Sequence, residues 1–203
     1  MENIDEQKII SEYLSLKQKR RDNKKSIVIR DDGSFLTSVV YTEPFFAKKV
    51  IDYFSPQFKV NDTFLDPCAG RMAFYNNLPE PKEFCEIQLE KDFLKYDKPV
   101  SWIFANFPWR GKVYSSLSEH ALKLSNNVVS LVKFNTALGT NKRLNDANKH
   151  NMYLKEIIRI PWNMAGFTFP DGSVKSPEGF LLTILHWQKN WQNGSTWNEW
   201  KSK

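Results

Sequence analysis

The sequence of 203 residues lacks the features that mark several common protein classes. Its 2 cysteines, Cys68 and Cys85, and its 3 histidines, His120, His150 and His186, lie far apart in the chain. This spacing is typical neither of a disulfide framework nor of a zinc site, so we expect a reducing compartment and no structural metal. The chain also has no Gly-Lys-Ser/Thr phosphate loop and no complete Gly-x-Gly-x-x-Gly element, which disfavours an ordinary nucleotide-binding protein.

Long apolar runs are also missing. None approaches the ~20 residues that a membrane-spanning helix needs, and the first residues, Met1 to Glu6, are acidic and polar, unlike a secretory signal. We therefore expect a soluble, cytoplasmic protein with no membrane partner. The hydrophobic fraction of 41% lies in the globular range, and the length favours one domain.

The net charge of +6 is unevenly distributed. Residues 17 to 25 hold six basic groups and one acid, so this stretch alone carries +5. Such a run suits contact with nucleic-acid phosphates, although a solvated helix end has the same composition.

Short apolar runs alternate with helix-like stretches along the chain. Strands are predicted for Thr63 to Leu65, Glu83 to Ile87, Trp102 to Ala105, Val128 to Phe134, Leu154 to Ile160 and Phe180 to Trp187. Helices are predicted for residues 4 to 16, Pro44 to Phe54, Val113 to Leu124 and Asn141 to Asn151. This alternation predicts an α/β fold with a mostly parallel sheet, helices on both faces and ligands at the carboxyl ends of the strands.

The domain organisation follows from the same pattern. We expect an N-terminal helix and basic segment over residues 1–33, one α/β domain over residues 34–190, and a polar C-terminal tail over residues 191–203. Neither an internal repeat nor a low-complexity tract is visible.

Two of the predicted strands end in residues suited to ligand binding. The run from Phe64 to Gly70 is an apolar strand that ends in an acid, a proline and small residues, which allow a ligand to approach the backbone. The run from Trp102 to Trp109 leads an apolar strand into an amide, a proline turn and a large aromatic. Asn106 offers a carbonyl acceptor, and Trp109 offers a flat face for a base, although a strand-end turn with a packed Trp has the same composition.

Together these segments resemble the class I S-adenosylmethionine-dependent amino-group methyltransferases, and most closely the compact N6-adenine DNA methyltransferases of phages and bacteria. The resemblance extends from Tyr41 to Trp187. Five segments match in family order: Tyr41–Phe46, Asp66–Gly70, Cys85–Ile87, Lys91–Leu94 and Asn106–Trp109. The last, Asn-Phe-Pro-Trp, stands in place of the catalytic Asn-Pro-Pro-Tyr/Trp of the family.

The resemblance implies S-adenosyl-L-methionine as cofactor and a role for each matching residue. The cofactor-binding residues would be Thr42 at the methionine end, the loop residues Asp66, Pro67, Ala69 and Gly70, Glu86 at the ribose, and Asp92 with Phe93 at the adenine. The catalytic residues would be Asn106, Phe107, Pro108 and Trp109. In this assignment the Asn106 amide oxygen and the Phe107 carbonyl accept the two hydrogens of the target amino group, and Trp109 stacks on the base.

The sequence departs from the family pattern at three points. Arg71 and Met72 stand where many relatives have a second glycine, Phe107 replaces a proline, and no separate target-recognition domain follows the core. An apolar residue at the Phe107 position also occurs in the ribosomal-RNA dimethyladenosine enzymes. This match keeps an RNA adenine methyltransferase open as an alternative. The resemblance implies a nucleic acid as partner, with DNA favoured over RNA. A non-catalytic nucleic-acid-binding subunit with this fold stays open, as does the oligomeric state.

Overall fold

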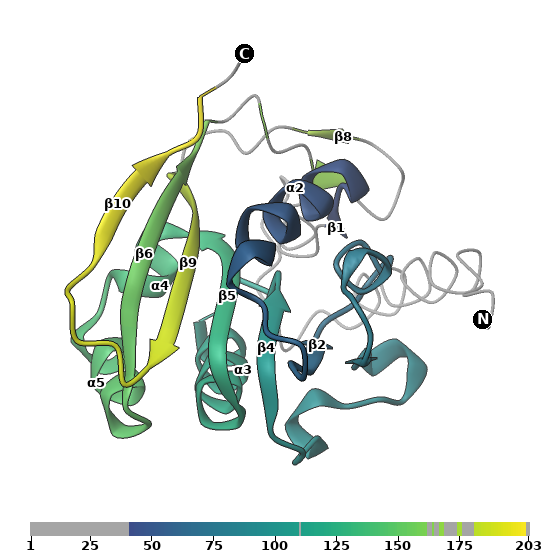
Figure 1. Ribbon diagram of the computed structural model, residues 1–203, viewed down its shortest axis with the longest axis horizontal. Helices are drawn as coiled ribbons and strands as arrows, with labels where there is room; N and C mark the ends of the chain where they lie inside the picture. Colours follow the sequence, from purple (N-terminus) through teal and green to yellow (C-terminus); the bar gives the residue numbers. More distant parts are fainter. Residues whose placement is uncertain are drawn as a thin grey trace, which may run out of the picture.

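The computed structural model describes residues 41–109, 111–161, 164, 167–168, 174–175 and 181–201. The predicted N-terminal helix and the basic run of residues 17 to 25 lie outside these residues. A seven-stranded sheet forms the centre of the described structure (Figure 1).

The sheet has the strand order β10-β6-β9-β5-β4-β2-β3. The strands are β2 (Phe64–Asp66), β3 (Lys82–Phe84), β4 (Val100–Ala105), β5 (Ser125–Lys133), β6 (Met152–Ile160), β9 (Leu182–Lys189) and β10 (Thr196–Glu199). All neighbouring pairs are parallel except those of β9, which is antiparallel to both β5 and β6. The sheet is therefore mostly parallel, as the alternating pattern predicts.

A second, smaller sheet is antiparallel and has three strands. It consists of β1 (Tyr41–Thr42), β7 (Phe167–Thr168) and β8 (Val174–Lys175), in the order β1-β7-β8. β1 directly precedes the first described helix, so the small sheet lies at the start of that helix.

Helices cover both faces of the large sheet, which confirms the predicted layers (Figure 1). They are α2 (Pro44–Phe54), α3 (Gly111–Leu124), α4 (Phe134–Leu138) and α5 (Asn141–Lys149). On β4, Trp102 and Phe104 pack with α2, whereas Ile103 and Ala105 pack in the cluster that includes α3. Because successive strand residues point to opposite faces, β4 is buried on both sides and reads as one apolar run.

The helix α2 has the bounds that the sequence predicts. Pro44 occupies the first helical turn, where its missing N–H costs no hydrogen bond. Glu43 stands at the N-cap without a side-chain hydrogen bond. The apolar residues of its inner face are all buried: Phe46, Val50, Ile51 and Phe54.

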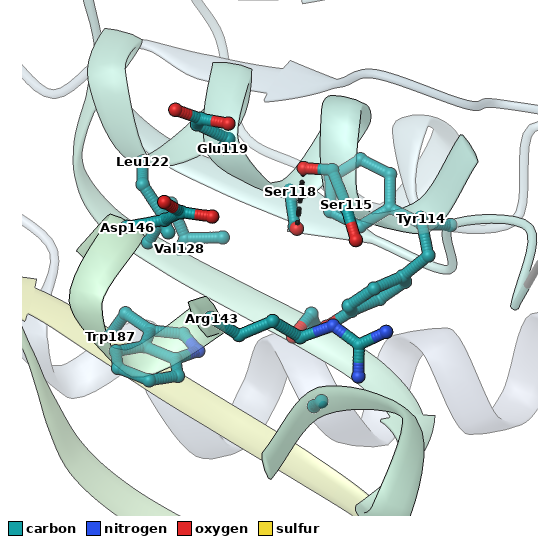
Figure 2. A pocket seen from close by; sticks show the side chains of 12 residues that line it. Tyr114, Ser115, Ser118, Glu119, Leu122, Val128, Arg143, Asp146 and Trp187 are labelled. Carbon is teal, nitrogen blue, oxygen red and sulfur yellow. Dashed lines mark hydrogen bonds between the residues drawn. The ribbon is translucent and has the colours of Figure 1, made fainter. Parts of the chain in front are cut away.

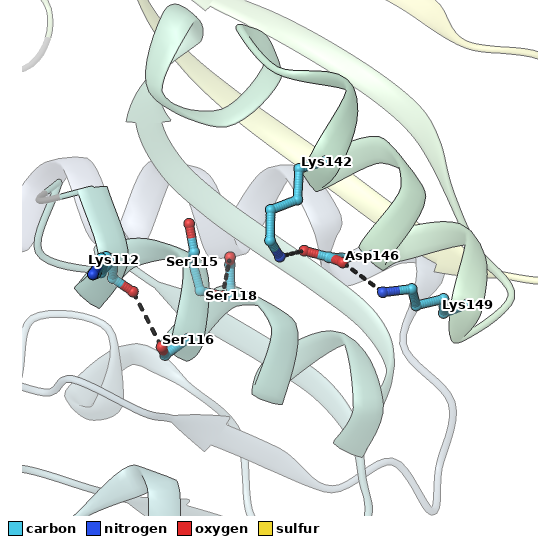
Figure 3. Close-up of polar contacts among 7 residues, drawn as sticks. All are labelled: Lys112, Ser115, Ser116, Ser118, Lys142, Asp146 and Lys149. Carbon is cyan, nitrogen blue, oxygen red and sulfur yellow. Dashed lines mark hydrogen bonds and ion pairs between the residues drawn. The ribbon is translucent and has the colours of Figure 1, made fainter.

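Polar contacts within α3 and α5 are drawn in Figure 3. The buried carboxylate of Asp146 on α5 accepts hydrogen bonds from Lys142 and, at 3.0 Å, from Lys149. On α3, the Ser116 hydroxyl donates to the Lys112 carbonyl oxygen at 3.1 Å. The contacts with Lys142 and Lys149 allow the mostly polar helix α5 to bury the Asp146 carboxylate without leaving it unpaired.

Two segments differ from the sequence-based expectation. β3 ends at Phe84 instead of Ile87, because Ile87–Leu89 forms a 3₁₀ turn that the Glu86 side chain caps. In the segment expected to be a tail, β10 pairs with β6, and Trp200 is buried against α2. The described part of this segment therefore completes the sheet. Among the described residues, no helix combines the length and apolar character needed to cross a membrane.

Candidate active site

The carboxyl ends of β2, β3 and β4 surround the main pocket of the described structure. β3 lies on one side of β2 and β4 on the other, so the chain changes direction across the sheet at this point. Such a switch point opens a crevice in which α/β proteins bind ligands. The pocket has a volume of about 470 Å³, within the range typical of small-molecule sites.

Most of the predicted site residues meet in this pocket. Its walls include Pro67, Gly70, Glu86, Asp92, Phe93, Asn106, Phe107 and Pro108. Thr42 and Ala69 line a small cleft that shares Tyr41, Cys68, Gly70 and Asn106 with the pocket. Asp66 and Trp109 line neither space.

The loop after β2 has backbone geometry that suits close approach to a ligand. Gly70 has a φ of +52°, and a Cβ there would lie 2.8 Å from the ring of Tyr41. Met72 also has a positive φ, 63°, in the region that favours glycine. Its buried side chain packs in the core, so the glycine-type conformation persists here without a glycine.

Glu86 links this loop to the end of β3. One carboxylate oxygen accepts from the Gly70 N–H at 2.7 Å, and the other accepts from the Gln88 N–H at 3.2 Å. The acid is thus buried, oriented by two backbone donors and exposed only at the pocket wall. A ligand with hydroxyl groups would find here an acceptor that is already positioned.

Asp66 lies below the pocket floor. Its carboxylate accepts from the Tyr75 N–H at 3.1 Å and from the Cys68 N–H at 3.4 Å. Burial raises the pKa of Asp66 to about 7, although the two backbone hydrogen bonds act in the opposite direction. Asp66 thus stabilises the conformation of the loop after β2 through hydrogen bonds to its backbone.

Asp92 and Phe93 form a further part of the wall of the main pocket. The Asp92 side chain accepts from the Leu94 N–H at 3.0 Å and so caps the 3₁₀ turn Phe93–Lys95. The ring of Phe93 is buried and lies parallel to that of Phe107, with centroids 6.2 Å apart. Carboxylates therefore stand beside an apolar surface, which suits a ring that carries polar groups.

Asn106 follows the last residue of β4 and is fixed by Thr42. Its amide nitrogen donates to the Thr42 hydroxyl at 3.2 Å. This bond restricts the rotation of the amide. The small antiparallel sheet, which holds Thr42, thereby positions a side chain at the end of the large one.

Phe107 lines both the main pocket and a second, much smaller cavity. Figure 2 shows this second cavity from close by. The Phe107 ring meets that of Tyr114 on α3 edge to face, with centroids 6.2 Å apart. The second cavity has a volume of about 20 Å³, room for about one water molecule. In Figure 2 the Arg143 side chain extends toward Tyr114, and its guanidinium carbon lies 5.2 Å from the ring centroid. Phe107 is thus a buried wall of both spaces.

Trp109 is half-buried beside the pocket. Its indole N–H donates to the Leu131 carbonyl oxygen at 3.2 Å, and its ring contacts both core clusters. The Lys133 ammonium lies 5.2 Å from the ring centroid. In this conformation the indole packs against β5 and does not line the pocket.

Sequence reasoning missed the contribution of α3. Its first turns supply Lys112, Val113, Ser116 and Leu117 to the pocket. The signal was available, because α3 follows the Asn106 segment directly and must begin at the same edge of the sheet. Three apolar side chains of the wall are unusually exposed: Ile87 by 71%, Leu94 by 49% and Val113 by 48%.

Comparison with solved structures identifies similar folds. A candidate RNA methyltransferase from Pyrococcus horikoshii matches with a TM-score of 0.54 at 10% identity, over 72% of this chain and 82% of that one. A candidate class I S-adenosylmethionine-dependent methyltransferase from Listeria monocytogenes matches with a TM-score of 0.51 at 15% identity, over 99% and 75%. A modification subunit of a candidate type I restriction enzyme from Vibrio vulnificus YJ016 matches with a TM-score of 0.52 at 12% identity, over 94% and 51%.

No protein-family model and no curated protein sequence matches the chain. The similarity to solved structures at these identities concerns the fold. The chain therefore has the Rossmann-like class I methyltransferase fold, with the pocket at the switch point of its sheet.

Proposed function

We propose that this protein binds S-adenosylmethionine in the pocket and transfers its methyl group to the 6-amino group of adenine in a nucleic acid, with DNA as the favoured substrate. The observation that carries the proposal is the meeting of Asn106 with Glu86, Asp92 and Phe93 around one cavity. These residues come from three separate segments of the sequence, and each matches the family in type and order.

The pocket residues fit this cofactor. The carboxylate of Glu86 can accept from a ribose hydroxyl, and Asp92 with Phe93 can accept from and pack against an adenine ring. The exposed apolar side chains of Ile87 and Leu94 extend the same wall. Bound there, S-adenosylmethionine would supply an electrophilic methyl group.

The residues of the Asn106 segment would act on the substrate amine. The amino nitrogen of adenine is a poor nucleophile because its lone pair is delocalised into the ring. Hydrogen bonds from that amine to the Asn106 amide oxygen and the Phe107 carbonyl would localise the lone pair on nitrogen. Positioning of this kind can contribute roughly 7 to 11 kcal/mol, and no side chain needs to become a covalent nucleophile.

A nucleic acid must present its base outside a duplex to reach such a pocket, which costs a few kcal/mol. Trp109 is the proposed stacking residue, and this role requires the indole to leave its contact with Leu131. Stacking is worth about 1–3 kcal/mol per base and would offset part of these costs.

RNA is the second candidate substrate. The Pyrococcus horikoshii neighbour is a candidate RNA methyltransferase, whereas the Vibrio vulnificus neighbour is a modification subunit of a candidate restriction enzyme. The same residues would serve either substrate, so the nucleic acid has to be identified by experiment.

The test is methyl transfer from labelled S-adenosylmethionine to duplex DNA, single-stranded DNA and RNA, followed by nucleoside analysis. We expect labelled N6-methyladenine in one of the DNA substrates. Label on RNA adenine alone would select the second candidate. Calorimetry that detects no binding of the cofactor, or label on cytosine, would overturn the proposal, and cofactor binding without any transfer would favour a non-catalytic subunit.

A further inference from the structure

Arg71 is a side chain near the pocket that the proposed function leaves without a role. It follows Gly70 in the loop after β2, at a position where many relatives have glycine. Its guanidinium carbon lies 4.8 Å from the centroid of the Tyr41 ring, and both residues line the small cleft beside Asn106. The ring thus holds the guanidinium at the pocket edge.

The charge of Arg71 has no acidic partner within the described part of the chain. Glu86, which contacts the adjacent Gly70, is already bound to the Gly70 and Gln88 amides. A half-buried guanidinium with five donors is therefore available for an anion that enters the pocket.

The position of the cleft indicates which anion this is. The cleft and the pocket share Tyr41, Cys68, Gly70 and Asn106, so they adjoin at the point where the methyl group would be transferred. The sulfur of S-adenosylmethionine carries three substituents: the methyl, the ribose carbon and the amino-acid chain. With the ribose at Glu86 and the methyl at Asn106, the third substituent has to extend toward the cleft.

We infer that Arg71 binds the α-carboxylate of the amino-acid end of S-adenosylmethionine. This inference rests on the proposed function and adds a residue to it. The planar fork of arginine matches a carboxylate with two parallel hydrogen bonds. The cleft has a volume of about 20 Å³, room for about one water molecule, so the carboxylate would bind at its mouth, where the cleft adjoins the pocket.

The experiment is calorimetry with two ligands that differ only in this group, S-adenosylmethionine and its decarboxylated analogue. Wild-type protein should bind S-adenosylmethionine about 10- to 100-fold more tightly than the analogue, the usual effect of one charge-assisted contact. Arg71→Met should bind the two ligands equally, because the intact cofactor alone loses affinity. Arg71→Lys should lie between, because the charge is kept and the fork is lost.

A matched control is Arg159→Met, which removes an arginine that pairs with Glu199 at the far side of the sheet. This variant should keep the wild-type preference for S-adenosylmethionine over the decarboxylated analogue. Equal weakening of both ligands by Arg71→Met would show that Arg71 only supports Tyr41 and would overturn the inference alone. Unchanged cofactor binding by Arg71→Met together with weaker nucleic-acid binding would also overturn the inference alone. Wild-type protein that binds neither ligand would overturn the proposed function together with the inference.

Discussion

Asn106 is the residue on which the proposed chemistry depends most directly. Asn106→Ala removes an acceptor that matters as charge develops on the amino nitrogen, so single-turnover methylation should fall by ~100- to 1000-fold. Cofactor affinity by calorimetry should largely survive. Thr42→Ala removes only the bond that orients the amide and should cause a smaller loss. Methylation by Asn106→Ala at the native rate would remove this residue from the mechanism.

Trp109 has two possible roles, and they predict different results. If the indole only packs against Leu131, Trp109→Ala should cost roughly 3–5 kcal/mol of stability, as large aromatic truncations do. If it also stacks on the target base, the apparent KM for nucleic acid should rise in Trp109→Ala and change little in Trp109→Phe. Thermal melts and steady-state kinetics on both variants separate the roles. A stable Trp109→Ala variant with native KM would contradict both.

The residues of the site were predictable from sequence where the signal is local. Glu86, Asn106 and the loop ending at Gly70 stand at strand ends, and they meet in one pocket. The role of Tyr41 could not be predicted in this way, because its contact with Gly70 and Arg71 depends on the small sheet. The first turns of α3 were missed, although their place directly after the Asn106 segment was a usable signal.

At the scale of elements, α2 was predictable to its bounds because Pro44 and the helical spacing of its apolar residues are both local signals. β10 was not, since its four residues are all exposed and become a strand only by pairing with β6. The short helix α4 was also missed. It begins at Phe134, directly at the end of β5, and Phe134 was assigned to that strand.

β10 and the residue after it should contribute measurably to stability. Trp200 is buried and packs edge to face on Phe46 and Tyr53 of α2, so Trp200→Ala should cost about 3–5 kcal/mol. Trp197, 53% exposed, is the matched control, and its truncation should cost about 1 kcal/mol or less. Denaturant titrations measure both. Equal effects of the two substitutions would show that the segment does not pack as described.

The basic run of residues 17 to 25 lies outside the described residues and stays a prediction from sequence. Neutralising several of its lysines and arginines should weaken nucleic-acid binding with little change in sequence preference. The dependence of affinity on salt should also become less steep, because fewer phosphate counterions are released. Binding measured at several salt concentrations tests this. An unchanged affinity and slope would assign the run to a solvated surface.

For the molecule as a whole, two buried groups should make stability respond to pH in opposite directions. Burial raises the pKa of Asp66 to about 7, so its contribution to stability is lost as pH rises from about 4 to 7. Burial, with a smaller effect of Lys155, lowers the pKa of His186 to about 3, so its contribution is lost as pH falls from about 6.5 to 3. Between pH 4.5 and 6.5 the two slopes offset each other.

Single substitutions should reveal each slope. In Asp66→Asn the His186 effect remains, and the free energy of unfolding should rise with pH by about 1.4 kcal/mol per unit in this window. In His186→Gln the Asp66 effect remains, and the free energy should fall at a similar rate. Urea titrations at pH 4.5, 5.5 and 6.5 measure both variants. Profiles parallel to that of the wild type would show that neither group titrates abnormally.

The position of β9 determines the order in which the sheet can be completed. β9 lies between β5 and β6 and supplies backbone hydrogen bonds to both, yet it is the last of the three in the chain. On the ribosome, β5 and β6 therefore emerge before the strand that joins them. A nascent chain that stops before Leu182 carries two apolar strands with open edges, which are templates for aggregation. Three of the seven strands, β9, β6 and β10, can therefore join the sheet only late in synthesis, and truncated products should be captured by chaperones or precipitate.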